Sequence, residues 1–305
     1  QKLYGPLGMT STSSRHDDFL ARANRAALHV AVNGAWTPKV TRDPDAQSPA
    51  GGVSSNVRDL VKWLSLEINA GRYDGRQVIA ADALAATHDP VINRGPNPVT
   101  GLPAFYALGW NVDFGPHGET WGHAGAFSAG ARTMVSILPD EKLGIVVLAN
   151  AFPSGVPEAM ADAFFDLVLD GAPSRDWLAT WNGIYDQFFG PGAMAAMGAA
   201  FAEPPAGASP ALPASAYVGR YANPYVGVAT VTETDGGLVL ALGPDGARTY
   251  PLEHFDRDTF TYVFSPEVPD VRSSAVFAIG PGQKAETLVL DDFAAGDATL
   301  PRVAD

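Results

Sequence analysis

The chain has 305 residues, of which 46% are hydrophobic and 17% charged, so it can bury a core and is about twice as long as an average domain. Its net formal charge is −13 and it contains no basic run, which argues against a nucleic-acid or anionic-membrane partner. It contains no cysteine, which excludes disulfides and cysteine nucleophiles, and no apolar run approaches the ~20 residues of a membrane span.

Residues 56–71 are predicted to form a helix that begins at Asn56 and ends at Gly71, two residue types that suit these positions. Its apolar residues recur on one face: Val57, Leu60, Val61, Leu64 and Ile68. The segment before it, 48–55, contains two adjacent glycines and predicts a tight loop whose backbone can closely approach another group.

Consecutive antiparallel strands are predicted at 121–126, 131–138 and 143–149, with a turn at 139–142. The segment between the first two strands has the spacing G-x-x-S-x-G around Ser128. A nucleophile elbow has the spacing G-x-S-x-G and is followed by a helix, so this segment is not predicted to carry a nucleophile.

Two helices are expected next. The first covers 157–170 and has an apolar face: Met160, Phe164, Leu167 and Val168. The second is expected to be capped by Ser174, and an alanine-rich continuation extends it to residue 202. Its aromatic stripe of Trp177, Trp181 and Tyr185 is interpreted as core packing rather than a ligand platform.

Residues 203–213 are rich in proline, alanine and glycine and are predicted to be a linker. Beyond it, short strand patterns alternate with turns at 235–237, 243–246 and 280–282. This regular turn spacing predicts a small all-β barrel.

Three segments, in this order, resemble the serine β-lactamases of class C and the related D-peptidases and esterases. They are LYGPLGMTST at 3–12, SPAGGVSSNVRDLVKWL at 48–64, and YALGW at 106–110 followed by WGHAGAFSAGARTMVSILPDEKLGIVVLAN at 121–150. The resemblance implies an α+β fold: the C-terminal part of a β-lactamase-like, transpeptidase-like domain with an antiparallel sheet packed by helices, then an all-β barrel. The expected domains are 1–202 with a long connecting helix, the linker 203–213, and a small lipocalin-like barrel at 214–305.

The resemblance also implies a site on the strand around His123. His123 takes the place of the lysine in the family's third motif, K-T-G or H-x-G. Gly125 would let substrate pack against the strand, and the Ala126 N–H would be one of two oxyanion donors. The alternative is a strand histidine whose ring is satisfied by a neighbour.

Two departures from the third motif bear on the substrate. A mostly neutral histidine replaces a permanent cation, and Ala124 replaces a threonine hydroxyl. Both changes weaken the binding of a substrate carboxylate such as that of a β-lactam. They favour an esterase or a D-amino-acid amidase or peptidase over a dedicated β-lactamase.

The family's nucleophile lies in S-x-x-K, and this motif does not occur between residues 1 and 305. The segment 221–223 has the letters of the second motif, Y-x-N, but it follows the linker and is taken as coincidence. We therefore expect a fragment or processed portion of a serine hydrolase that acts through an acyl-enzyme on a D-amino-acid peptide, an ester or a β-lactam. Its partners would be a small-molecule or peptide substrate and a missing N-terminal segment of the same protein with the S-x-x-K and Y-x-N motifs.

The chain alone is expected to be inactive, and the rival hypothesis is a non-catalytic pseudoenzyme or ligand-binding module. The resemblance implies a periplasmic or secreted protein, with the cytoplasm as the open alternative. No cofactor and no metal are expected. The even spacing of His117, Glu119 and His123 would suit a metal on a strand, but the glycines between them favour turns. The charges at 16–18 and at His88 and Asp89 are interpreted as solvated loop residues.

Overall fold

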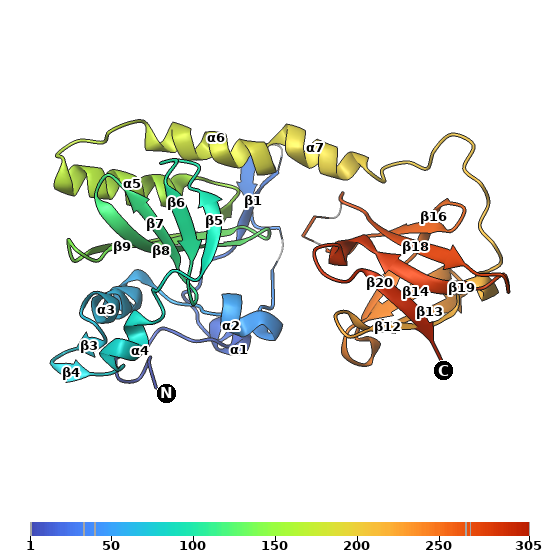
Figure 1. Ribbon diagram of the computed structural model, residues 1–305, viewed down its shortest axis with the longest axis horizontal. Coiled ribbons are helices and arrows are strands. Elements are labelled where there is room, and N and C mark those ends of the chain that lie inside the picture. The colour runs from blue at the N-terminus through green and yellow to red at the C-terminus, as the bar shows by residue number, and fades with distance from the viewer. Residues whose placement is uncertain (1, 33, 40, 266, 269, 305) are drawn as a thin grey trace. The chain divides into compact units, whose positions relative to one another are not determined.

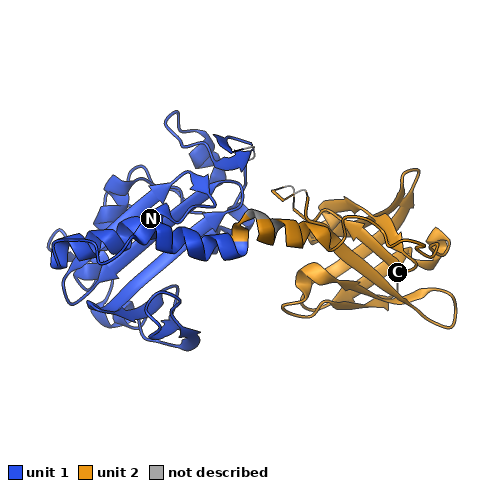
Figure 2. Cartoon of the chain, turned by 90° about the horizontal axis from the view of Figure 1, so that it is seen from above, with its two compact units in different colours: residues 1–188 blue, residues 189–305 orange. Residues whose placement is uncertain are grey.

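The computed structural model describes residues 2–32, 34–39, 41–265, 267–268 and 270–304. The chain forms two compact units, residues 1–188 and 189–305 (Figure 2). Helices and an antiparallel sheet build the first unit, and an antiparallel barrel builds the second. The predicted fold class is confirmed.

The main sheet of the first unit has six antiparallel strands in the order β10-β9-β8-β7-β6-β5 (Figure 1). Their bounds are β5 Ile92–Pro96, β6 Pro103–Tyr106, β7 Asn111–Gly115, β8 Gly118–Phe127, β9 Ala131–Leu138 and β10 Leu143–Ala149. The three strands expected between 121 and 149 are all present, and β8 extends beyond its predicted ends because its first half pairs with β7.

Helices cover both faces of this sheet (Figure 1). Side chains of a strand alternate between faces, and β9 shows the alternation clearly. Val135 and Ile137 pack with Leu64 of helix α3, Val57–Ile68. Met134, Ser136 and Leu138 line a cavity on the other face, together with residues of helices α5, Val156–Leu169, and α6, Trp177–Phe189.

Helix α3 begins as predicted but ends at Ile68, before the predicted end at Gly71. The Asn56 side chain accepts a hydrogen bond from Asp59 N at 3.0 Å, as a cap should. Gly71 lies just past the C-cap Asn69; its φ of +80° favours glycine and its N–H donates to Leu66 O in the last turn. The predicted apolar face is only partly correct, because Val57 and Val61 are about half exposed.

Two expectations for α5 and α6 are wrong. Asp176, not Ser174, caps α6, since Ala179 N donates to Asp176 Oδ1 at 2.9 Å. On α5, Met160 and Leu167 of the expected apolar face are about half exposed, while Phe165 is buried. The face of α5 toward α6 instead carries a row of carboxylates, Glu158, Asp162 and Asp166, each hydrogen-bonded to an aromatic residue of α6.

Shorter elements complete the first unit. Sheet β11-β1-β2 contains Ala151–Phe152, His29–Val32 and Ala35–Thr37, and the hairpin β3-β4 contains Arg72–Tyr73 and Arg76–Gln77. The remaining helices are α1 His16–Leu20, α2 Ser48–Gly51, α4 Ala81–Ala85 and the 3-10 turn Asp45–Gln47. Segment 48–55, expected as a loop, thus begins with one helical turn, and Ser54 then bridges to Ser13.

The second unit begins with α7, Pro191–Ala199, and contains a nine-stranded antiparallel sheet in the order β15-β14-β13-β12-β20-β19-β18-β17-β16. Its end strands follow each other in the chain, and the sheet curls into a nearly closed barrel (Figure 1). The strands are Gly219–Asn223, Gly227–Thr234, Gly237–Leu242, Arg248–Pro251, Glu253–Asp256, Thr259–Tyr262, Ser273–Ile279, Ala285–Leu290 and Thr299–Val303. The 3-10 turns are Ala214–Ala216, Pro244–Gly246 and Asp291–Phe293.

Side chains from these strands fill the barrel, and the largest fully buried ones include Tyr217, Tyr221 and Tyr262. The Tyr221 hydroxyl donates to Tyr217 O at 2.5 Å and accepts from Arg302 Nη2 at 2.7 Å. Tyr221 is therefore a core residue of the barrel. Among the described helices, none has both the length and the apolar character that a bilayer span requires.

Candidate functional site

Strand β8 is paired with both β7 and β9 in its first half, but only with β9 in its second half. Its pairing with β7 runs from Gly118 to Gly122 and stops there. Its pairing with β9 continues to Phe127. Residues 123–127 therefore form an edge to which no described strand is paired on the β7 side.

The turn after β8 fixes which backbone groups face this open edge. Gly130 N donates to Phe127 O at 2.9 Å, so the Phe127 carbonyl faces β9. Backbone groups of successive strand residues face opposite edges. The N–H and C=O groups of Ala124 and Ala126 therefore face the open edge.

The three residues named from the sequence lie together on this half of β8. The His123 side chain is exposed, with Nδ1 2.7 Å from Ala124 O and Nε2 3.1 Å from the Tyr106 hydroxyl. At Gly125 a Cβ atom would lie 2.8 Å from Thr133 Oγ1, too close to fit without movement. A larger residue at this position would therefore press on the Thr133 side chain of β9.

Tyr106 begins the YALGW segment, but no role was expected for its side chain. It ends β6 and pairs with Asn111, which in turn pairs with Gly122, the residue before His123. The Tyr106 and His123 rings meet edge to face, with centroids 5.9 Å apart. The signal in the sequence was a tyrosine at a strand end, and only the sheet register shows which side chain it reaches.

His88 corrects another expectation, since it is not a solvated loop residue. It is 5% exposed and stacks on Trp121, with ring centroids 3.7 Å apart. Its Nε2 lies 3.4 Å from Oε2 of Glu67, which is 6% exposed. Trp121 and His123 lie on the same face of β8 because they are two residues apart. His88 thus supports the strand just before the candidate site.

A second polar region lies between α5 and α6. Trp181 Nε1 donates to Asp162 Oδ2 and Trp177 Nε1 to Asp166 Oδ2, each at 2.7 Å. Burial raises the pKa of Asp162 to about 6. Burial also acts to raise the pKa of Asp166, but hydrogen bonds from Ser174 N and Trp177 outweigh it and hold that pKa below the usual value.

The third carboxylate of this row, Glu158, accepts a hydrogen bond from the Tyr185 hydroxyl at 3.0 Å and pairs with Arg132 of β9. Burial raises the pKa of Glu158 and lowers that of Arg132, while their mutual attraction opposes both shifts. Asp162 and Asp166 of this row line the cavity between the sheet and α5–α6, which has a volume of about 480 Å³ and is not lined by His123.

His117, Asp166 and Asp170 are the described residues whose ligand atoms lie close enough to share a cation, within 4.8 Å of one another. His117 Nε2 is 2.8 Å from Asp170 Oδ2. Asp166 already accepts hydrogen bonds from Ser174 N and Trp177. These contacts account for the cluster as a hydrogen-bonded junction between the β7–β8 turn and α5.

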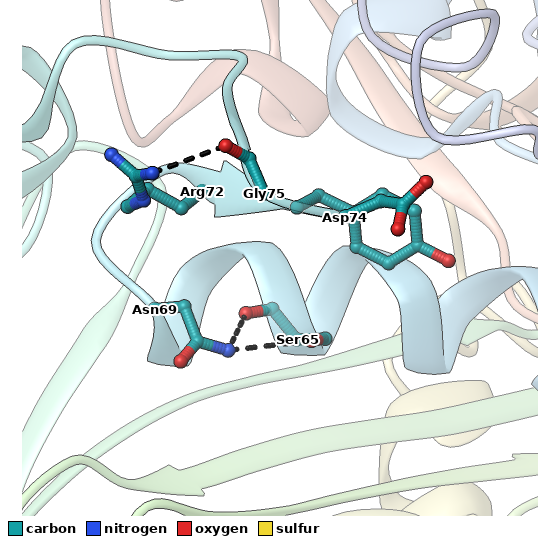
Figure 3. Close-up of a pocket in the computed structure, with 6 residues that line it drawn as sticks. Ser65, Asn69, Arg72, Asp74 and Gly75 are labelled. Carbon is teal, nitrogen blue, oxygen red and sulfur yellow. Dashed lines mark hydrogen bonds between the residues drawn. The ribbon is translucent and has the colours of Figure 1, made fainter.

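A further hollow lies at the end of α3 beside the β3-β4 hairpin (Figure 3). Arg72 donates to Gly75 O there, and Asn69 donates to Ser65. None of the three residues predicted for the site lines it, and its hydrogen bonds are local ones that close a turn.

The Beta-lactamase family matches residues 1–169, and the chain belongs to this family. A domain of unknown function, DUF3471, matches residues 203–301. No curated protein matches. This match confirms the predicted β-lactamase-like character of the first unit.

Solved structures give further likenesses. The C-terminal domain of penicillin binding protein Rv0907 is 43% identical, over 32% of this chain and 93% of that one, with a TM-score of 0.29. The octameric penicillin-binding protein homologue from Pyrococcus abyssi is 18% identical, over 95% of this chain and 56% of that one, with a TM-score of 0.46. A D-stereospecific amidohydrolase from Streptomyces sp. is 20% identical, over 49% of this chain and 42% of that one, with a TM-score of 0.39. The chain thus spans about half of the latter two proteins.

Proposed function

We propose that this chain is the C-terminal portion of an S-x-x-K serine hydrolase that acts on an amide or ester through an acyl-enzyme. The nucleophilic serine and its lysine would come from a preceding segment of the same protein, since the family requires this motif and residues 1–305 do not contain it. The chain would contribute one wall of the cleft.

The open half of β8 is the observation that carries this proposal. An oxyanion donor must be a fixed N–H that is not already used in the sheet. Ala126 N–H faces the edge to which no described strand is paired, and β9 holds it rigidly from behind. We assign it the role of one oxyanion donor, with Gly125 as the position where substrate packs against the strand.

His123 supports a preference among substrates. Its ring lacks the fixed charge of a lysine, and Ala124 lacks the hydroxyl of a threonine. Carboxylate-bearing β-lactams would therefore be poorer substrates than neutral esters or D-amino-acid amides and peptides. We propose an esterase or D-amino-acid amidase or peptidase.

A free strand edge and an exposed apolar helix face suggest that another segment packs against the first unit. Strand β10 ends the six-stranded sheet and has no described strand on its outer side. Beside it, α5 exposes Val156, Met160, Leu167 and Val168, each between 39% and 53%. An apolar sheet edge next to an apolar helix face is a surface that proteins normally cover. We propose that the nucleophile-bearing segment covers it.

Reconstitution tests the proposal. The chain is produced with and without the preceding coding region, and hydrolysis of a p-nitrophenyl ester, a D-alanyl anilide and a β-lactam is measured. A fluorophosphonate probe identifies the acylated serine by mass spectrometry. We expect activity only with the preceding region, and labelling of a serine in S-x-x-K within it.

Labelling of a serine inside residues 1–305 would contradict the assignment of the nucleophile. If the joined protein contains no S-x-x-K and hydrolyses none of the substrates, the pseudoenzyme or binding-module hypothesis replaces ours. The His123→Ala variant is the matched control, because it should retain labelling of the serine but turn over ester more slowly.

A further inference from the structure

A second polar side chain, that of Tyr106 on β6, lies next to His123 at the open edge of β8. It is not part of the family's third motif. Tyr106 reaches His123 from β6, although β7 lies between β6 and β8 in the sheet. It can do so because β7 begins at Asn111 and its pairing with β8 ends at Gly122. Beyond that row no described strand lies between the phenol and the imidazole.

The two hydrogen bonds of His123 determine where its proton lies. A carbonyl oxygen only accepts, so Nδ1, 2.7 Å from Ala124 O, must carry the hydrogen. In the neutral imidazole Nε2 is then an acceptor. The Tyr106 hydroxyl, 3.1 Å away, must therefore be the donor.

This arrangement sets the polarity that the pair presents to a ligand. The hydrogen of Nδ1 is bound to Ala124 O, and the hydrogen of the Tyr106 hydroxyl is bound to Nε2. The group left to bind a ligand is the phenol oxygen, which accepts hydrogen bonds through its lone pairs. Ala124 O lies on the same edge and is also an acceptor.

We propose that Tyr106 is a substrate-positioning residue and that the Tyr106–His123 pair recognises a hydrogen-bond donor of the substrate, a protonated amine or an amide N–H, rather than a carboxylate. The inference rests on the proposed function for the presence of a substrate at this edge. It goes beyond that function because it names the polarity of the group that is bound and the residue that binds it.

The tautomer is tested first, by NMR of the intact protein labelled with ¹⁵N-histidine. We expect His123 to carry its proton on Nδ1 and to show a hydrogen-bonded Nε2. In Tyr106→Phe the Nε2 resonance should move toward that of a free imidazole, while the proton stays on Nδ1. A proton on Nε2 in the neutral wild-type ring would overturn the proposal.

Binding is tested with two matched probes, D-alaninamide, which carries an ammonium group, and N-acetyl-D-alanine, which carries a carboxylate. We expect the wild type to bind D-alaninamide at least ten times more tightly. Tyr106→Phe should weaken D-alaninamide about ten- to a hundredfold, the range for a hydrogen bond to a charged group, and leave N-acetyl-D-alanine unchanged. Equal affinity of the wild type for both probes, or an unchanged affinity in Tyr106→Phe, would overturn the proposal.

Tyr73→Phe is the matched control, since it removes a hydroxyl from the same unit at a hollow that neither Tyr106 nor His123 lines, and it should leave both affinities unchanged. Neither measurement requires the nucleophile. A protein that prefers D-alaninamide but hydrolyses no substrate would retain the Tyr106–His123 assignment and lose the proposed function. A protein that hydrolyses the substrates but does not prefer D-alaninamide would retain the proposed function and lose the Tyr106–His123 assignment.

Discussion

The indole nitrogen of Trp181 donates a hydrogen bond to Asp162 at 2.7 Å, and this contact is the middle one of three. One turn along α6 in either direction, Tyr185 bonds to Glu158 and Trp177 to Asp166. Aromatic residues four apart on α6 thus meet acidic residues four apart on α5. The rings of this stripe are half-buried rather than part of the core that was expected, and those of Trp177 and Trp181 line the cavity between the sheet and the two helices. Their polar atoms bind the carboxylates.

Asp162→Asn should stabilise the first unit at pH 7.5 and have little effect near pH 4. Burial raises the folded-state pKa to about 6 from 3.8, so the native state binds the proton more tightly than the unfolded state. Stability is therefore gained as the pH falls through about 6 toward 4, and the difference corresponds to at most roughly 3 kcal/mol. Asparagine stays neutral and keeps an oxygen for Trp181. Thermal melts of the chain joined to its preceding segment, followed by circular dichroism between pH 4 and 8, measure this, and a pH-independent effect of the substitution would contradict it.

Asp166→Asn should destabilise the first unit at pH 7.5, the opposite of the effect expected for Asp162→Asn. The pKa of Asp166 is lowered, so its contribution to stability is present above the unfolded pKa and is lost as the pH falls through the folded value. Replacing it removes a charge that accepts from Ser174 N and Trp177, which we expect to cost roughly 1–2 kcal/mol at pH 7.5. Urea unfolding of the chain joined to its preceding segment, at pH 7.5 and at pH 3, compares the ionised and the protonated Asp166. A stabilised Asp166→Asn variant at pH 7.5 would disprove this assignment.

The strands, the main helices and the all-β character of the second unit followed from periodicity and turn residues, because these are local properties of the sequence. The orientation of α5 did not, since Met160 and Leu167 look like core residues until the pairing of Asp162 with Trp181 is known. His88 was misjudged for a similar reason: its burial depends on Trp121, which is 33 positions away and on another element. His123 could be named from a motif, but its contact with Tyr106 depends on sheet register.

His123→Ala should leave the fold intact, because backbone hydrogen bonds hold β8, and should lower kcat/KM of the complete hydrolase by roughly 10- to 1000-fold. His123→Lys should shift preference from neutral esters toward β-lactams, because it restores a fixed cation for a carboxylate. The measurement is kcat/KM for a p-nitrophenyl ester and a β-lactam. Identical values for the wild type and both variants would show that His123 is only a strand residue.

The first unit should require the preceding segment for stability, while the barrel should not. In differential scanning calorimetry of the chain alone, we expect one cooperative transition from the barrel and a broad or absent one from residues 1–188. Adding the preceding segment should sharpen that second transition and remove self-association in gel filtration, since it would cover β10 and the apolar face of α5. A monodisperse chain with two sharp transitions by itself would contradict the prediction.

The segment 203–305 should fold by itself. Its core cluster comes entirely from residues between 211 and 293 and Leu300, so no apolar contact from the first unit is needed to complete it. Tyr221→Phe should destabilise it by about 1–3 kcal/mol, because it leaves Tyr217 O and the Arg302 guanidinium without their buried partner. Urea denaturation of the isolated segment measures whether it folds and how much Tyr221→Phe destabilises it. Tyr225→Phe is the control, because Tyr225 is exposed. A segment without a cooperative transition would refute the prediction.

The equal spacing of the three contacts between α5 and α6 also limits how the two helices can slide. Insertion of one residue between Trp177 and Trp181 would turn the rest of α6 by about 100° and separate two of the three pairs at once. If α6 slid along α5 by one full turn, two aromatic–carboxylate pairs would form again with new partners. The third carboxylate, Glu158 or Asp166 depending on the direction, would then face no aromatic donor of the stripe. A buried carboxylate without a donor is costly. The two end pairs, rather than the middle one, therefore determine where α6 stops along α5.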